Sequence, residues 1–183
     1  VGHLGDGGVV RRNGRLVRVP TAFRSREIDF GDGPEHAVTI PWGDVVTAAH
    51  STGIESIEVY AAAPPWTKRL LPVADSLGWL LDRRPVDGLA KWLIDARLDG
   101  PDGRDLATGS AVVWGEVADA SAGRRVRGRL RTPNPYALTA ESAVTAAERV
   151  LEGDVSAGFR TPASAFGADF ALELSGTDRE LVT

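Results

Sequence analysis

The stretches SREIDF and HAVTIPW alternate apolar and polar positions, with the period of a β-strand. Asn13-Gly14 is the strongest two-residue signal for a type I′ turn, so it predicts a β-hairpin between two β-prone arms. A second hairpin is predicted around the turn Gly31-Asp32-Gly33-Pro34. The arms of the first hairpin are 9–12 and 15–19, and those of the second are 25–30 and 36–42.

A short helix and a strand are expected next. The helix lies near 43–51, with Asp44 in its first turn as a cap and Gly53 just past its end as a stop. The stretch IEVYAAA, 57–63, predicts a buried strand ended by prolines.

The period changes to that of a helix over about 66–98, where leucines recur three and four residues apart. Because Pro85 stands where a second helix would begin, we expect an αα-hairpin insertion here.

The last third is predicted to hold a hairpin, a helix and a final strand. The hairpin joins 110–120 to 124–132, and Thr139 is a candidate N-cap for a helix that stops at Gly153. FALEL, 170–174, is expected as the last strand. The apolar stripe of the helix comprises Ala140, Ala143, Val144, Ala147, Val150 and Leu151.

Strands in hairpins with helices inserted in blocks indicate an α+β fold. We expect one mixed, largely antiparallel sheet with helices packed on one face. The length of 183 residues suits a single domain over 1–183.

Composition excludes several classes of site. The chain has no cysteine, which removes thiol catalysis, zinc ribbons and disulfides. A net charge of −4 gives no global attraction to nucleic acid or anionic lipid. No apolar run is long enough to span a membrane and no signal peptide is evident, so we expect a cytoplasmic protein. Because the chain begins at Val1 and contains no methionine, we expect a piece of a longer protein.

The stretch PWGDVVTAAHST combines Asp44, His50 and Ser51, the residue types of a hydrolytic site. On a helix, Asp44 and His50 lie about 120° apart, so they do not meet on one face. That spacing disfavours a hydrolase, and only His50 remains a catalytic candidate, since an imidazole at a helix end can titrate or donate to a ligand. The three histidines fall in separate elements without metal-ligand spacing, so no metal site is expected.

Arginines occupy every second position of the strand 124–132, so their side chains project from one face. Two interpretations stay open: an anion site for a phosphate or carboxylate substrate, or a solvated face neutralised by acids of the paired strand, with Glu116 a candidate. These residues are Arg125, Arg127, Arg129 and Arg131.

The loop that follows this strand leads into a helix N-terminus, a place where ligands bind. We therefore predict substrate-binding residues here: Arg131, Thr132, Asn134 and Tyr136. The glycine-rich start GHLGDGG lacks the preceding strand and following helix of a phosphate loop, so no cofactor-binding residue is predicted in this chain.

Two stretches together carry a family resemblance: IPWGDVVTAAHSTGIESIEVY and RTPNPYALTAESAVTAAERVLEGDVSAGFRTPASAFGADF. They resemble the C-terminal half of saccharopine dehydrogenase-like oxidoreductases, a family that includes trans-acting enoyl reductases. The similarity extends over nearly the whole chain, and it is one of long segments that carries over no catalytic residue.

This resemblance implies a parent NAD(P)H-dependent reductase in which an N-terminal Rossmann domain holds the cofactor. The chain itself would then contain no Rossmann domain, bind no dinucleotide, be inactive alone, and complete the substrate side of the cleft. The substrate would be a small molecule or an unsaturated acyl chain with 66–98 lining its path, and homodimer contacts are also expected. The alternative is a non-catalytic dimerisation module, or one that binds lipid or a protein partner.

Overall fold

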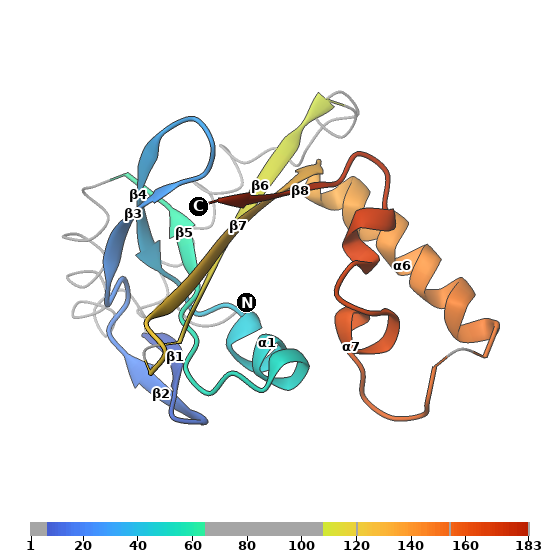
Figure 1. Cartoon of the computed structure of the whole chain (residues 1–183), viewed down its shortest axis with the longest axis horizontal. Helices are drawn as coiled ribbons and strands as arrows, with labels where there is room; N and C mark the ends of the chain where they lie inside the picture. The colour runs from blue at the N-terminus through green and yellow to red at the C-terminus, as the bar shows by residue number, and fades with distance from the viewer. Residues whose placement is uncertain (1–6, 65–107, 120, 154, 183) are drawn as a thin grey trace, which may run out of the picture. The chain divides into compact units, whose positions relative to one another are not determined.

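The computed structural model describes residues 7–64, 108–119, 121–153 and 155–182 (Figure 1). These residues form two compact units, 7–28 with 34–64 and 29–33 with 108–182. The predicted αα-hairpin at about 66–98 lies outside the described residues. The single domain over 1–183 stays a prediction.

The first unit begins with the hairpin of β1 (Gly8–Arg12) and β2 (Arg15–Val19), which pair antiparallel. Asn13 and Gly14 both have positive φ, 46° and 75°, as a type I′ turn requires. The predicted first hairpin is confirmed.

A three-stranded sheet follows, with the strand order β3 (Ser25–Asp29), β4 (Pro34–Thr39), β5 (Tyr60–Ala62). The second hairpin is therefore confirmed. The predicted buried strand 57–63 is wrong in length and burial, because β5 has three residues and none is buried. Ile57 instead exchanges two backbone hydrogen bonds of 3.0 Å with Arg11, so the chain changes partner strand partway along the segment.

The helix α1 (Asp44–Thr52) ends at Gly53, whose φ of 71° is left-handed and whose N–H donates to the carbonyl of Ala49. The predicted stop is confirmed. The N-cap is Gly43 and no side chain caps the helix, so the predicted capping role of Asp44 is wrong. Asp44 is the first helical residue, where its charge lies near the positive end of the helix dipole, and its Oδ1 accepts a hydrogen bond of 3.5 Å from the Thr47 hydroxyl.

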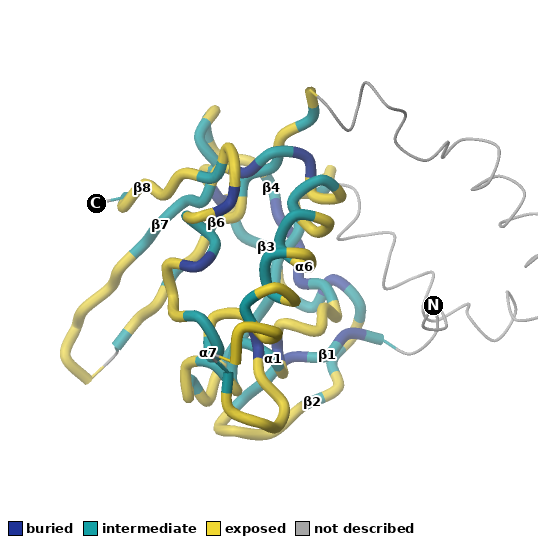
Figure 2. Tube along the Cα trace, turned by 90° about the vertical axis from the view of Figure 1, so that its right-hand side faces the viewer, coloured by how far each residue is buried: buried dark blue, intermediate teal, exposed yellow. Residues whose placement is uncertain are grey.

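The core of this unit is small, and its buried residues, dark blue in Figure 2, are mostly apolar. It gathers inward positions of β1, β3 and β4, one residue of the turn between β2 and β3, and one residue of α1. Its buried residues include Val10, Ala22, Ile28, Ala37, Val38 and Val45.

The second unit carries a sheet in the order β6 (Ser110–Asp119), β7 (Arg124–Pro133), β8 (Asp178–Val182), with both pairs antiparallel. The third hairpin is confirmed. FALEL is not a strand, because Phe170–Glu173 form the 3₁₀-helix η1 and the last strand β8 follows it. The remaining helices of the described part are α6 (Pro135–Leu151) and α7 (Pro162–Phe166).

The α+β class with largely antiparallel pairing is confirmed. The described strands form three sheets of two, three and three strands instead of the single sheet expected, since each hairpin pairs mainly within itself or with one further strand. Within the described residues, no helix has the length and apolar character needed to cross a membrane.

Candidate functional site at the start of α6

The arginine row of β7 is partly neutralised by the neighbouring strand, as one of the two interpretations predicts. Glu116 on β6 is directly opposite Arg127 in the register, and its Oε2 lies 2.7 Å from Arg127 Nε and 3.6 Å from Arg125 Nη1. These two arginines are therefore compensated by Glu116.

Arg129 is held more tightly, and only 10% of its side chain is exposed. Its Nη2 lies 2.7 Å from Asp29 Oδ2, its Nε donates to the Asp29 carbonyl oxygen at 2.9 Å, and Glu180 Oε2 lies 3.7 Å from its Nη1. The pKa of the Asp29 carboxyl is lowered, chiefly by the Gly31 N–H that donates to it at 2.8 Å and also by Gly33 N–H and Arg129. Arg129 is thus a structural cation that fixes the loop 29–33.

Arg131 differs from the other three, because no ion pair joins it to a carboxylate of the described residues. Its guanidinium lies against the backbone of Gly31, where an added Cβ would come within 2.9 Å of Nη2. Gly31 has a φ of 135° and leaves room for this approach. The second unit therefore presents one cation of the row that is exposed and not neutralised.

The next two predicted ligand residues are buried and serve the backbone. Thr132 Oγ1 lies 3.0 Å from the carbonyl oxygen of Pro133, and Asn134 Oδ1 accepts the N–H of Tyr136 at 2.9 Å. Asn134 is thus the N-cap of α6, with Pro135 at its first position. Tyr136 itself is 65% exposed.

The expected N-cap at Thr139 is wrong. Thr139 lies one turn inside α6 and donates its hydroxyl to the carbonyl of Pro135 at 2.7 Å. Asn134-Pro135 begins the helix earlier, because the Asn side chain caps it and the proline needs no N–H partner in the first turn.

The structure thus brings Arg131, Thr132, Asn134 and Tyr136 together at one junction, in two roles. Thr132 and Asn134 fix the backbone, whereas the side chains of Arg131 and Tyr136 are exposed. A cation and a hydrogen-bond donor at the beginning of a helix can bind an anionic oxygen group.

His50 lies in the last turn of α1, where it is exposed, and Asp44 lies at the opposite end of the same helix. Ser51 Oγ donates to the carbonyl of Thr47 at 2.9 Å. The three residues therefore do not form the arrangement of a hydrolytic triad. His50 belongs to the first unit, and the junction of β7 and α6 belongs to the second.

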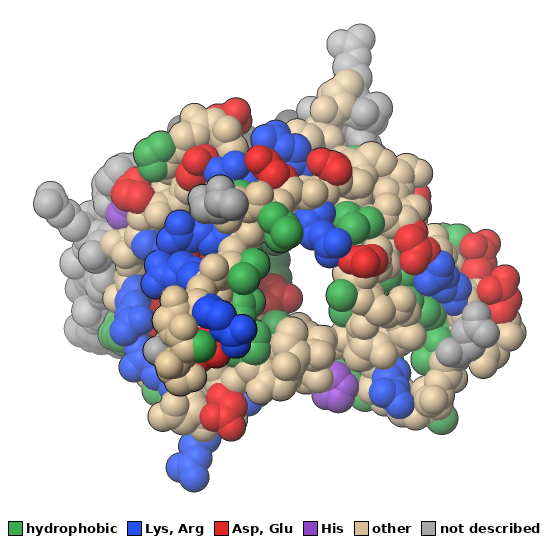
Figure 3. Space-filling model, in the orientation of Figure 1, with side chains coloured by type: hydrophobic (Ala, Val, Ile, Leu, Met, Phe, Trp, Pro, Cys, Tyr) green, Lys and Arg blue, Asp and Glu red, His purple; other side chains and the backbone are tan. Residues whose placement is uncertain are grey.

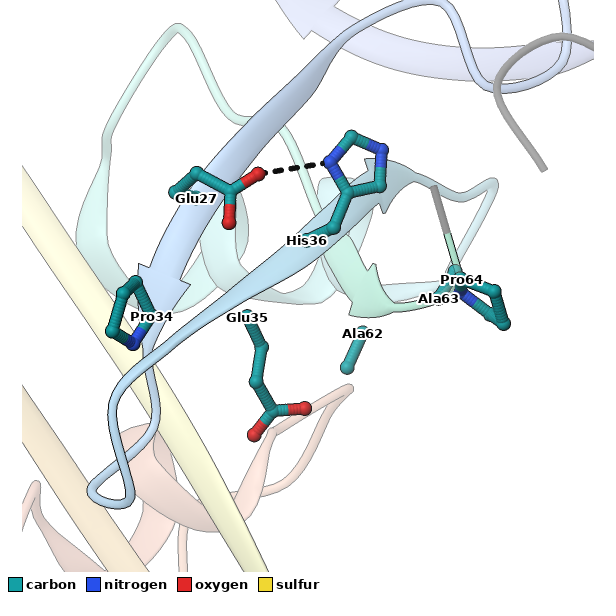
Figure 4. A pocket seen from close by; sticks show the side chains of 7 residues that line it. All are labelled: Glu27, Pro34, Glu35, His36, Ala62, Ala63 and Pro64. Carbon is teal, nitrogen blue, oxygen red and sulfur yellow. Dashed lines mark hydrogen bonds and ion pairs between the residues drawn. The ribbon is translucent and has the colours of Figure 1, made fainter. Parts of the chain in front are cut away.

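A carboxylate and imidazole pair was missed by the sequence analysis. Glu27 on β3 and His36 on β4 point toward each other beside a shallow pocket, with His36 Nδ1 3.0 Å from Glu27 Oε1 (Figure 4). The other ring nitrogen of His36 is buried without a hydrogen-bond partner. Among the residues that the structure describes, no group of three or more His, Asp or Glu is arranged to hold a metal ion.

Tyr60 gives a pH-dependent prediction. Burial, followed by the hydrogen bond that its hydroxyl donates to Glu58 Oε2 at 2.7 Å, raises its pKa from 10.0 to about 12. In an unfolded chain the tyrosine hydroxyl loses its proton near pH 10. The contribution of Tyr60 to the free energy of unfolding is therefore complete below pH 10, and it is lost as the pH rises to about 12.

The measurement is an ultraviolet absorbance titration of Tyr136→Phe, in which Tyr60 is the remaining tyrosine of the two in the chain. We expect a midpoint near 12, and a lower midpoint when Glu58→Gln is added. An ordinary tyrosine midpoint in Tyr136→Phe would contradict the burial and hydrogen bonding of this phenol.

The sequence analysis named Glu116 but missed the two partners of Arg129, Asp29 and Glu180. Glu180 reaches Arg129 only because β8 pairs with β7, and the sequence places the last strand elsewhere. Asp29 could have been found locally, since an aspartate two residues before a glycine forms an Asx-turn such as Asp29 makes with Gly31.

A scan against models of protein families gives no match, and a search of curated proteins gives none either.

Proposed function

We propose that this chain is the substrate-side domain of an NAD(P)H-dependent reductase similar to the saccharopine dehydrogenase-like enzymes. The observation that supports this is the junction of β7 and α6, where Arg131 and Tyr136 are exposed on a backbone fixed by two buried polar side chains. The acceptor that we propose is the conjugated double bond of an acyl chain from a lipid or polyketide, as in an enoyl reductase.

In this proposal Arg131 binds the carboxylate or phosphate of the substrate, since its guanidinium has no carboxylate partner among the described residues. The Tyr136 hydroxyl would donate a hydrogen bond to the acyl carbonyl oxygen, which draws electron density away from the double bond. His50 stays a catalytic candidate in the first unit, and 66–98, expected to line the acyl path, lies outside the described residues.

The loop 29–33 does not fit a dinucleotide phosphate. The N–H groups of Gly31 and Gly33 already donate to the Asp29 carboxylate, which a phosphate would have to displace. We therefore propose that NAD(P)H is held by an N-terminal Rossmann domain of the same parent protein, and that the chain alone is inactive.

The test is a calorimetric titration of the chain with a medium-chain trans-2-enoate. We expect Arg131→Gln to weaken enoate binding roughly tenfold, the loss typical of a hydrogen bond to a charged group. Arg127→Gln is the matched control from the same row, because Glu116 already engages Arg127. Equal binding by Arg131→Gln and wild type, or no binding by either, would overturn the proposal.

A second titration, with NADPH, examines where the cofactor is held. We expect NADPH to show no measurable affinity for the chain alone. Tight NADPH binding would contradict the separate Rossmann domain, even if enoate binding depended on Arg131 as proposed.

The non-catalytic alternative is also supported by one observation. Of the 17 residues of α6 none is buried, and Val144, Val150 and Leu151 are 59, 54 and 87% exposed. Figure 3 shows hydrophobic side chains at the surface of the region that carries α6 in Figure 1. A dimerisation module would use such a surface, and it predicts that neither ligand binds.

A further inference from the structure

The apolar side of α6 faces away from its own unit. The inward side is polar: Glu141 accepts the N–H and hydroxyl of Ser175 at 2.9 and 2.8 Å, and Arg149 pairs with Glu173. The pKa of Glu141 is lowered, first by the Ser175 N–H and then by its hydroxyl. These contacts fix the rotation of the helix about its axis, so its apolar residues point outward.

The outward stripe consists of residues that are all exposed, and we call it the α6 stripe. Figure 2 colours the helix teal and yellow, without dark blue. An isolated helix gains most of its stability from packing, so a stripe of this kind indicates a covering surface. The α6 stripe is Tyr136, Ala140, Ala143, Val144, Ala147, Val150 and Leu151.

Small and large side chains follow each other along the α6 stripe in nearly the same order from either end. The midpoint lies between Ala143 and Val144. Ala140 and Ala147 are equally far from it, and so are the large residues Tyr136 and Leu151. Positions 136, 140, 143, 147 and 150 also follow the alternating spacing of four and three residues of a coiled-coil seam.

We propose that the α6 stripe is a homodimer interface in which a second copy of this chain packs its own α6 antiparallel across a two-fold axis at this midpoint. Ala140 of each copy then meets Ala147 of the other, which allows close approach at the centre. Tyr136 meets Leu151 at both ends. Such an isologous contact requires a self-complementary surface, which is what the order of residues supplies.

The charges of α6 limit what can cover the α6 stripe. Glu148 is exposed beside the C-terminal half of the stripe, and the first turn has no charged residue. An anionic membrane is disfavoured, because the only arginine of α6 is the inward Arg149.

The expected dimer is weak. The 17 residues of α6 span about 25 Å, and one helix pair of that length buries less than the roughly 800 Å² per partner of a standard interface. We expect reversible dissociation in the micromolar range, visible by analytical ultracentrifugation across a concentration series.

The first test is one substitution on the stripe with two controls. Ala143→Glu places two carboxylates near the two-fold axis and should weaken dimerisation at least about tenfold. Ala122→Glu, in the exposed turn of the β6–β7 hairpin, should leave it unchanged. Val126→Glu, on the exposed apolar face of the sheet β6-β7-β8, should also leave dimerisation unchanged. Circular dichroism checks that each variant is folded.

The second test uses disulfide crosslinking, since the chain has no cysteine of its own. Ala143→Cys should crosslink to itself on mild oxidation. Tyr136→Cys and Leu151→Cys should each fail alone and crosslink when the two variants are mixed. A parallel pair would give the opposite pattern, with self-crosslinking at every position, and would overturn the proposal.

A monomer at all concentrations would overturn it as well. In that case, protection of Ala143→Cys from a thiol reagent would indicate that another part of the same chain covers the stripe, and rapid reaction would indicate that nothing does. The dimer goes beyond the proposed function, because Arg131 is not part of the α6 stripe and the dimer can form or fail whether or not Arg131 binds an enoate. Tyr136 belongs to both proposals, so the dimer is tested at Ala143 and enoate binding at Arg131.

Discussion

Replacing Val10 with aspartate is expected to unfold the first unit, with a loss of about 4 kcal/mol or more in the free energy of unfolding. Val10 is 1% exposed and is the largest fully buried side chain of the described residues. A carboxylate at this position would be removed from water without a partner, whereas every other buried residue of β1, β3 and β4 except Thr39 is apolar or a glycine. Protonation would relieve only part of that cost.

Leu16→Asp is the matched control, because it introduces the same group into the same hairpin at a site that is 52% exposed. Leu16 lies opposite Arg11 in the register, so the new carboxylate would face a cation. We expect a change within about 0.5 kcal/mol. Urea denaturation followed by circular dichroism measures both variants, and equal stability of the two would show that Val10 is not in the core.

The features that the sequence predicted correctly depend on a few neighbouring residues. Asn13-Gly14 determines its hairpin because both residues tolerate positive φ, and Gly53 ends α1 for the same reason. Turn and stop signals of this kind act within one or two residues. Their prediction therefore needs no knowledge of the tertiary structure.

Two errors were made near the C-terminus: FALEL was predicted as a strand, and the strand β8 was missed. FALEL is a short apolar run, which periodicity alone cannot assign to a strand or a helix. Asp178–Val182 has little apolar character but pairs with β7, where Arg129 is opposite Glu180. That strand depends on a partner far away in the sequence, so the pattern of its own residues does not reveal it.

The helix α6 shows a further limit of pattern reasoning. Its apolar stripe has the predicted members and Tyr136 in addition. The ion pair between Arg149 and Glu173 and the hydrogen bonds between Glu141 and Ser175 turn this stripe outward. Periodicity identifies an amphipathic helix, but it does not say which surface covers the apolar side. The same limit applies to the candidate site. The sequence predicted all four residues there as ligand contacts, and only the contacts of the structure show that Thr132 and Asn134 bond to the backbone instead.

Replacing Phe170 with alanine is expected to lower the free energy of unfolding of the second unit by about 3–5 kcal/mol, the cost of removing a buried aromatic side chain and leaving a cavity. Phe170 is 4% exposed, its ring centroid lies 5.0 Å from that of Phe166, and the Arg149 guanidinium lies 5.4 Å from it.

The loss should extend to α6, because the ring contact of Phe170 helps to place Arg149, which joins the helix to η1 through Glu173. Phe159→Ala removes the same ring at a site that is 69% exposed, and we expect it to cost less than about 1 kcal/mol. Thermal and urea unfolding of both variants, with ellipticity as the measure of helix content, compares the two losses. If Phe170→Ala were as stable as Phe159→Ala, α6 would be held by its polar contacts alone, and the packing of η1 beneath Arg149 would add nothing to the stability of the unit.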